Sequence, residues 1–140
     1  VGWTTRRVST SACEQSNTGV TSWTNITSLP TTLHRLTMVT LRGNAYVIGG
    51  YDGAGAQTSV FMYDGVSVWV AKAALSPGRH GHAALALDDD RALVCGGYAP
   101  STVANTCVIY TASTNTWTTA PAMAQARQNF NLVMSEGMRH

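Results

Sequence analysis

The chain has 140 residues, 44% of them apolar and 11% charged, with a net charge of +2 at pH 7 and Lys72 as its sole lysine. So small a charge, with no basic run, argues against a nucleic-acid partner. No window approaches the roughly 18 consecutive apolar residues of a membrane-spanning helix, so direct membrane insertion is not expected. Thirteen glycines and many threonines and valines favour strands and tight turns.

The N-terminal part begins at Val1 without a methionine and without a recognisable leader. We therefore expect the chain to be processed or to be a fragment of a longer protein. Asn25 opens an Asn-Ile-Thr sequon, which could accept a glycan in a secretory pathway. Such tripeptides are common by chance, and a plain outer strand is the favoured interpretation of this segment.

The strongest feature of the sequence is a repeat of 46 to 48 residues, marked by Trp23, Trp69 and Trp117. Two copies contain a strand-like run that ends in a glycine pair, and a tyrosine precedes the next tryptophan by six or seven residues. The glycine pairs are Gly49 with Gly50 and Gly96 with Gly97, and the tyrosines are Tyr63 and Tyr110.

Each repeat predicts four short strands separated by turns. In the first full repeat, we expect strands at residues 36–41, 45–49 and 59–63 and around Trp69, with a glycine-rich loop at 51–58. The second strand is apolar on both faces, which implies that each small sheet is covered on both sides. Radial stacking of such sheets in a propeller satisfies this pattern, and a linear stack is the weaker alternative.

The runs Arg79-His80-Gly81-His82 and Gly49-Gly50-Tyr51-Asp52-Gly53, each followed by the tyrosine and the tryptophan, resemble kelch repeats. The resemblance implies an all-β, kelch-type β-propeller with four-stranded antiparallel blades. Such a ring has six or seven blades, so this chain would form an incomplete one. We expect the outer half of a blade at 1–32, kelch repeats at 33–78 and 79–126, and the first strand of a further blade at 127–140. The remaining blades of the same propeller are the first partner expected.

Strand order places the loops after the glycine pairs on the same face as the segments before each first strand. This face is the predicted partner-binding face, where His34 and Arg35 also lie. Its predicted residues are Tyr51, Asp52, Gln57, Arg79, His80, Tyr98 and Arg127. Arginine and tyrosine are enriched in binding hot spots, and the resemblance to kelch substrate adaptors implies a protein or peptide partner, often acidic. For Arg79 and Arg127, bonding to a neighbouring blade's backbone is an equally good interpretation.

The repeated tryptophans and glycine pairs are expected to be structural: the tryptophans pack between blades, and the glycines allow bends or close approach. His80 and His82 could share a metal, but a third ligand is missing, and a structural histidine is favoured. The acidic run Asp88, Asp89 and Asp90 is read as a solvated turn in preference to a calcium site. No cofactor and no metal are therefore expected.

The cysteines give one sharper hypothesis. A hairpin closed by Gly97 and Asn105 places Cys95 opposite Cys107, within reach of a disulfide. Two buried thiols are the alternative. A bridge would favour an extracellular or secretory setting over a cytoplasmic one. Cys13 aligns with Cys107, but the sequence shows no cysteine at the position of its disulfide partner. We expect that partner to precede Val1.

These features favour a protein–protein interaction scaffold and not an enzyme. An architectural repeat of an extracellular or filament protein is one alternative. A galactose-oxidase-like copper enzyme is the other, but the sequence has no spacing that gathers its histidines and tyrosines into a site.

Overall fold

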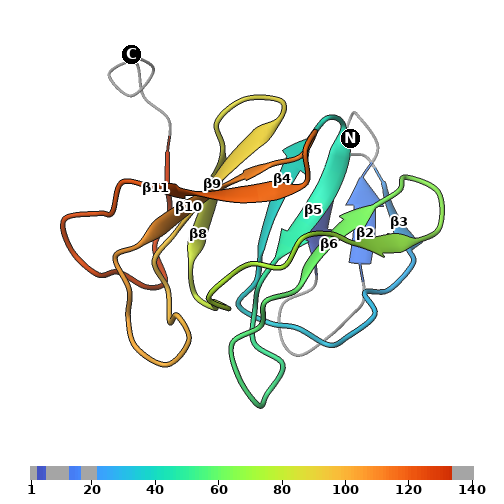
Figure 1. Cartoon of the computed structure of the whole chain (residues 1–140). Coiled ribbons are helices and arrows are strands. Elements are labelled where there is room, and N and C mark those ends of the chain that lie inside the picture. The colour runs from blue at the N-terminus through green and yellow to red at the C-terminus, as the bar shows by residue number, and fades with distance from the viewer. Residues whose placement is uncertain (1–2, 6–12, 17–21, 134–140) are drawn as a thin grey trace.

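In a computed structural model of the chain, residues 3–5, 13–16 and 22–133 are described, and they form three antiparallel β-sheets (Figure 1). The first sheet contains β1 (Trp3–Thr5), β2 (Cys13–Ser16) and β3 (Trp23–Ile26). The middle sheet contains β4 (Thr37–Leu41), β5 (Asn44–Ile48), β6 (Val60–Tyr63) and β7 (Trp69–Ala71). The last sheet contains β8 (Ala83–Ala86), β9 (Arg91–Cys95), β10 (Cys107–Thr111) and β11 (Thr116–Ala120).

The two four-stranded sheets are meanders in which sequence neighbours pair, in the orders β4-β5-β6-β7 and β8-β9-β10-β11. The predicted strands of the first full repeat agree with β4 to β7 to within one residue at each stated end. The all-β, four-stranded blade architecture expected from the repeat is confirmed. No helix of the described residues is long and apolar enough to cross a membrane.

The first sheet differs from the expected half blade, because it has three strands and not two. β1 pairs with β2 and places Thr5 opposite Cys13. The position opposite Cys13 is therefore occupied by Thr5. The expectation that the residue facing Cys13 precedes Val1 is wrong. The sequence concealed β1 because Arg6-Arg7 follow it, where the other two repeats have the glycine pair.

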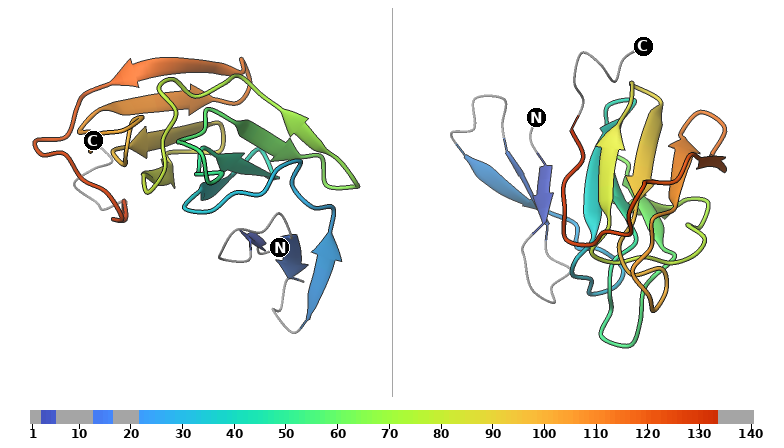
Figure 2. Two further views of the ribbon diagram at one scale, coloured as in Figure 1. Left: turned by 90° about the horizontal axis from the view of Figure 1, so that it is seen from below. Right: turned by 90° about the vertical axis from the view of Figure 1, so that its left-hand side faces the viewer.

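The middle sheet is buried on both faces, as its uniformly apolar second strand predicted. One face presents Val39 and Ile48 to Val94 of the last sheet, and the other presents Ala45 and Val47 toward the first. Figure 2 shows the three sheets fanned side by side, with the middle one enclosed by its neighbours. Full burial of each such aliphatic side chain contributes about 2 kcal/mol.

Tryptophan side chains fasten each sheet to the one before it. The indole nitrogen of Trp69 donates to the Thr27 carbonyl at 2.7 Å, and that of Trp117 donates to the Ala73 carbonyl at 2.9 Å. Each ring also packs on the tyrosine of its own hairpin, with centroids 5.2 Å apart for Tyr63–Trp69 and 5.0 Å for Tyr110–Trp117. The side chain of Trp23 lies outside the described residues.

The glycine pairs form the second fastening. The Gly50 amide donates to the Arg79 carbonyl at 2.8 Å, and the Gly97 amide donates to the Arg127 carbonyl at 2.7 Å. A Cβ on Gly49 would lie 2.6 Å from the Arg79 carbonyl oxygen, and the φ of 64° at Gly49 also disfavours a side chain. The predicted role of the glycines in close approach is therefore confirmed. The hydrogen bonds between the sheets recur with the same period as the sequence repeat.

Residues 127–133 begin the next repeat but form no strand within the described part of the chain. A strand requires a ladder partner, and no described strand pairs with this segment. The first strand of a further blade within 127–140 stays a prediction, and residues 134–140 lie outside the described residues.

A disulfide joins Cys95 of β9 to Cys107 of β10, with their Cα atoms 4.2 Å apart. The two residues face each other in the strand register, as the hairpin argument predicted. In the middle sheet the corresponding pair is Ile48 and Val60, two buried aliphatic residues. The bridge thus replaces an apolar contact at an otherwise repeated position.

Reduction of this bridge should lower the free energy of unfolding by about 3 kcal/mol, because the cross-link restricts the unfolded chain. Urea unfolding with and without a reductant measures the difference. Peptide mapping of the unreduced protein should recover Cys95 and Cys107 in one linked species. Recovery of both cysteines as free thiols would contradict the bridge.

Candidate functional site

The loop after β5 and the loop after β9 both return to the segment that precedes the first strand of their own sheet. His34 and Tyr51 exchange backbone hydrogen bonds of 3.0 and 2.8 Å. His80 and Tyr98 do the same at 3.2 and 2.9 Å. These pairings confirm the predicted juxtaposition of the two kinds of segment at one end of the sheets.

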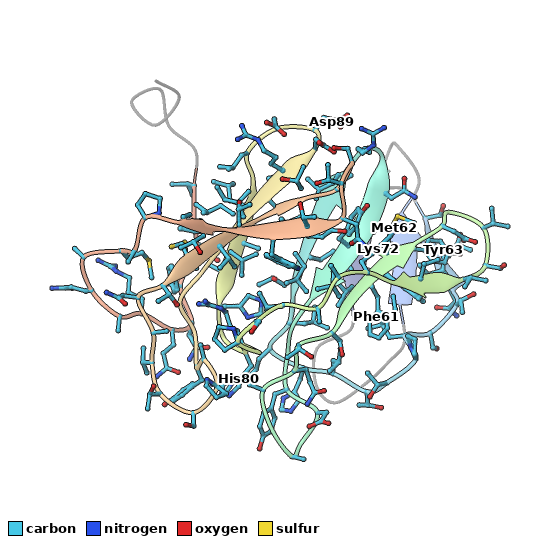
Figure 3. All side chains as sticks on the ribbon, viewed as in Figure 1. Phe61, Met62, Tyr63, Lys72, His80 and Asp89 are labelled. Carbon is cyan, nitrogen blue, oxygen red and sulfur yellow. A yellow bond between two sulfur atoms is a disulfide. The ribbon has the colours of Figure 1, made fainter. Side chains whose placement is uncertain are left out.

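Four rings at this end form a continuous row, which we call the ring ladder: His34, Tyr51, His80 and Tyr98. The successive ring centroids are 5.1 Å apart for His34–Tyr51, 4.9 Å for Tyr51–His80 and 5.1 Å for His80–Tyr98. The ladder therefore crosses from the middle sheet to the last one. Figure 3 places His80 at this end of the sheets and Asp89 at the opposite end.

A hollow of about 520 Å³ opens beside the ring ladder. Its wall combines the four rings with a cation and with small loop residues. The additional lining residues are Arg35, Ala54, Gly55, Ala56, Pro100 and Ser101. Because the lining residues come from both sheets, the hollow exists only where two blades meet.

Arg35 is the cation of the hollow. Its guanidinium donates toward Nδ1 of His80 at 3.4 Å, and the residue is exposed. Burial of the His80 ring lowers the pKa of that histidine, and the charge of Arg35 and the neighbouring His34 lower it further. His80 is therefore neutral at pH 7, and the positive charge at the hollow is that of Arg35.

Asp52 lies in the loop after β5 and is exposed, but its carboxylate is engaged by its own loop. Oδ1 accepts hydrogen bonds from the amides of Ala54 at 2.8 Å and Gly55 at 3.0 Å. The same bonds lower the pKa of Asp52. Asp52 thus shapes the rim of the hollow. Gln57 is half-buried and donates from its amide side chain to the Gly55 carbonyl at 3.0 Å, so it also supports this loop.

Arg79 does not lie on the accessible face where it was predicted, because its side chain is fully buried, with 0% exposed. Its guanidinium donates to the carbonyls of Gly96 at 3.1 Å and Thr106 at 3.0 Å, and to the Thr106 hydroxyl at 2.8 Å. These acceptors belong to its own sheet, not to a neighbouring one. Leu33, which occupies the same repeat position in the previous copy, is buried as well.

Arg127 occupies the same repeat position once more, but it is exposed and does not line the hollow. Its backbone repeats the bonds of Arg79: its carbonyl accepts from Gly97 at 2.7 Å and its amide donates to Ala104 at 3.1 Å. The adjacent Gln128 reaches the ladder, since its side-chain amide donates to the Tyr98 hydroxyl at 3.3 Å. Of the predicted face, the structure gathers Tyr51, His80 and Tyr98 into one site and separates Arg79 and Arg127 from it.

His82 lies behind the ladder, and its ring is buried. Nε2 is 2.9 Å from the Thr37 hydroxyl and 3.0 Å from the Ile48 carbonyl, whereas Nδ1 has no hydrogen-bond partner among the described residues. Burial lowers the pKa of His82 to about 4. The ring is therefore neutral and joins β4 and β5 to the start of the last sheet.

The acidic run at the opposite end forms a structural network. Asp90 accepts hydrogen bonds from the Ser113 amide at 2.8 Å and the Ser113 hydroxyl at 2.6 Å, and it lies 3.6 Å from Arg42. Asp88 pairs with Arg91 at 2.8 Å. Among the described residues, no group of three histidine, cysteine, aspartate or glutamate side chains is placed to hold a metal ion.

Asn25 is exposed in β3, and its glycosylation stays a prediction.

The stacked, four-stranded meanders define this chain as part of a β-propeller. Residues 32–64, which span β4, β5 and β6, match the family model of the kelch motif, and the antiparallel all-β sheets are consistent with a kelch-repeat fragment. A comparison with curated proteins found no match. Kelch propellers generally serve as protein-interaction modules, and the kelch match supports this general function.

Replacing Arg79 by methionine should lower the free energy of unfolding by about 3 kcal/mol, because it removes three hydrogen bonds from a buried guanidinium and leaves the buried Gly96 carbonyl without this donor. Arg127→Met is the matched control, since Arg127 has the same backbone bonds and an exposed side chain. Its expected effect is below about 0.5 kcal/mol. Urea unfolding of the two variants makes the comparison, and equal losses would contradict the structural role of the Arg79 guanidinium.

The pKa of His82 predicts an acid-sensitive fold. In the unfolded chain the ring takes up a proton near pH 6.5, whereas in the folded chain its pKa is about 4, so the unfolded state binds more protons between these values. The free energy of unfolding should therefore fall as the pH drops from about 6.5 to 4, by about 3 kcal/mol in total.

His82→Gln provides the control, because the amide can still donate to the Ile48 carbonyl but does not titrate. Urea midpoints measured across this range should fall less steeply with decreasing pH in the variant. Titration of His80 contributes a smaller decrease of the urea midpoint with falling pH, since its pKa is also lowered. An unchanged slope in His82→Gln would rule out His82 as the main source.

Proposed function

We propose that the ring ladder and the hollow beside it bind an extended segment of a partner protein. The observation that supports this most directly is the meeting of the four rings and Arg35 across two blades. The hollow is lined by groups suited to recognition: ring edges, one guanidinium, a serine hydroxyl and small loop residues. Among the described lining residues there is no carboxylate pair and no nucleophile held by a base.

The chemistry of the hollow favours a partner with acidic side chains. Among the described lining residues, Arg35 is the only arginine, lysine, aspartate or glutamate, and a guanidinium binds a carboxylate through paired, charge-assisted hydrogen bonds. The tyrosines add large contact surfaces whose conformational freedom is already restricted by the ladder, which reduces the entropy lost on binding. A carboxylate at Arg35 with apolar neighbours along the rings is the arrangement we expect.

Selection from a random peptide library on the immobilised full chain tests the proposal. We expect enrichment of peptides with aspartate or glutamate, and weaker binding at higher salt because the ion pair is partly exposed. Fluorescence anisotropy with an enriched peptide should show a Kd at least about 10-fold higher for Arg35→Ala and for Tyr98→Ala, a loss of about 1.4 kcal/mol each.

Arg42→Ala is the matched control for Arg35→Ala. Both arginines are exposed, both have positive φ (51° at Arg42 and 55° at Arg35), and they flank β4 at opposite ends. The backbone cost of the two substitutions is therefore similar, whereas only Arg35 lines the hollow. Equal weakening by both variants, or peptides whose binding neither variant alters, would contradict the proposed site.

A further inference from the structure

We propose that the outer edge of β7 is an interaction surface for a second copy of this chain, with the two β7 strands paired antiparallel. Three observations carry this inference: an open strand edge, a row of exposed valines along it, and opposite charges that such a pairing brings together. β7 belongs to the middle sheet, whose neighbours on both faces are described, and it lies apart from the ring ladder.

The open edge is the outer side of β7, which pairs only with β6 among the described strands. Figure 2 shows this hairpin at the outer end of the middle sheet. The Val68 carbonyl accepts from the Asp64 amide at 3.0 Å, and the Lys72 amide donates to β6 at 2.8 Å. Because these backbone groups alternate in direction along a strand, those of Trp69 and Ala71 point outward. An edge of this kind can accept another strand.

Exposed valines follow this hairpin at every second position. Val66, Val68 and Val70 are 80%, 50% and 37% exposed, and they are three of the four large apolar side chains exposed in the described part of the chain. On β11 of the last sheet, Thr116 and Thr118 occupy the positions that correspond to Val68 and Val70, and both are exposed. A blade therefore folds with polar residues there, and the row of valines marks a surface for association.

The backbone groups that remain available determine the register of the pairing. The amides and carbonyls of Ser67 and Ala73 are already bonded within the chain, which leaves those of Trp69 and Ala71. All of these are bonded only when Trp69 of each copy faces Ala71 of the other. Val70 then meets Val70 of the second copy on the twofold axis, in a close, non-hydrogen-bonded pair with Cα atoms about 4.5 Å apart.

The same register makes the edge complementary to itself in charge. Lys72 of the second copy faces Val68, and Asp64 lies on the other side of Val68, bonded to it across the hairpin. Residues directly opposite one another share a face of the sheet, so the lysine stem would cover the valine and its ammonium would approach the Asp64 carboxylate. Three backbone amides bond to Oδ1 of Asp64 and lower its pKa, so the carboxylate is charged at pH 7. Because the twofold axis repeats this ion pair, a second copy is the occupant that the edge fits.

A single cysteine on the twofold axis tests the register. Val70→Cys in a Cys13→Ser background of the full chain should form a covalent dimer on mild oxidation, which non-reducing electrophoresis shows and a reductant removes. Thr118→Cys in the same background is the matched control, because Thr118 holds the same place on β11 and is exposed. The control should remain monomeric. Equal amounts of dimer in the two variants, or a Val70→Cys chain that stays monomeric, would overturn the proposal.

Light scattering measures the association of the unmodified chain. Few residues pair, so we expect a weak, reversible dimer, with an apparent mass that rises from 14.8 kDa toward twice that value as the concentration increases from about 10 μM to about 1 mM. Lys72→Glu should raise the dimer Kd at least about 10-fold, because it places like charges together.

The double substitution Val68→Thr, Val70→Thr separates the edge from any other contact, since it reproduces the threonines that β11 already carries. Its circular dichroism spectrum should be unchanged, and its apparent mass should stay at that of the monomer over the same concentrations. A wild-type chain that remains monomeric throughout, or a threonine variant that associates as the wild type does, would overturn the proposal.

Discussion

The constraint on which the structure depends is that each small sheet must be covered on both faces. The middle sheet meets it fully: Val39 and Ile48 contact one neighbour, and Ala45 and Val47 face the other. Trp69 and Trp117 then fix the spacing of the sheets by bonding to backbone carbonyls just after the last strand of the preceding sheet. Burial drives the stacking, and these directional bonds set how the sheets are aligned.

The candidate site follows from that alignment. Tyr51 belongs to one sheet and His80 to the next, and their centroids come within 4.9 Å because the Gly50 amide bonds to the Arg79 carbonyl beside them. The candidate site is therefore a product of blade packing. A substitution that shifts one sheet against its neighbour would disturb the ladder without altering any of its rings.

The sequence predicted most of the fold, because tryptophans and glycine pairs mark positions that repeat. It also predicted which loops and segments meet at one end of the sheets, since strand order alone determines this. It did not reveal β1, whose trailing Arg6-Arg7 lacks the glycine signal, or the mutual contact of the rings, which depends on the distance between sheets. Strand order placed Arg79 on the predicted face, with backbone bonding as an equal alternative, and the apolar Leu33 at the same repeat position was an available sign that this position faces inward.

The disulfide between Cys95 and Cys107 makes the two hairpins of the candidate site differ in how they are closed. It closes the base of the hairpin that carries Tyr98, whereas the hairpin that carries Tyr51 is closed at the same place by the packing of Ile48 on Val60. One side of the hollow is thus closed by a covalent bond, and the other side is closed by a non-covalent contact. In a reducing environment both hairpins would be closed by non-covalent contacts alone. The difference between the two sides of the hollow therefore depends on the compartment in which the protein works.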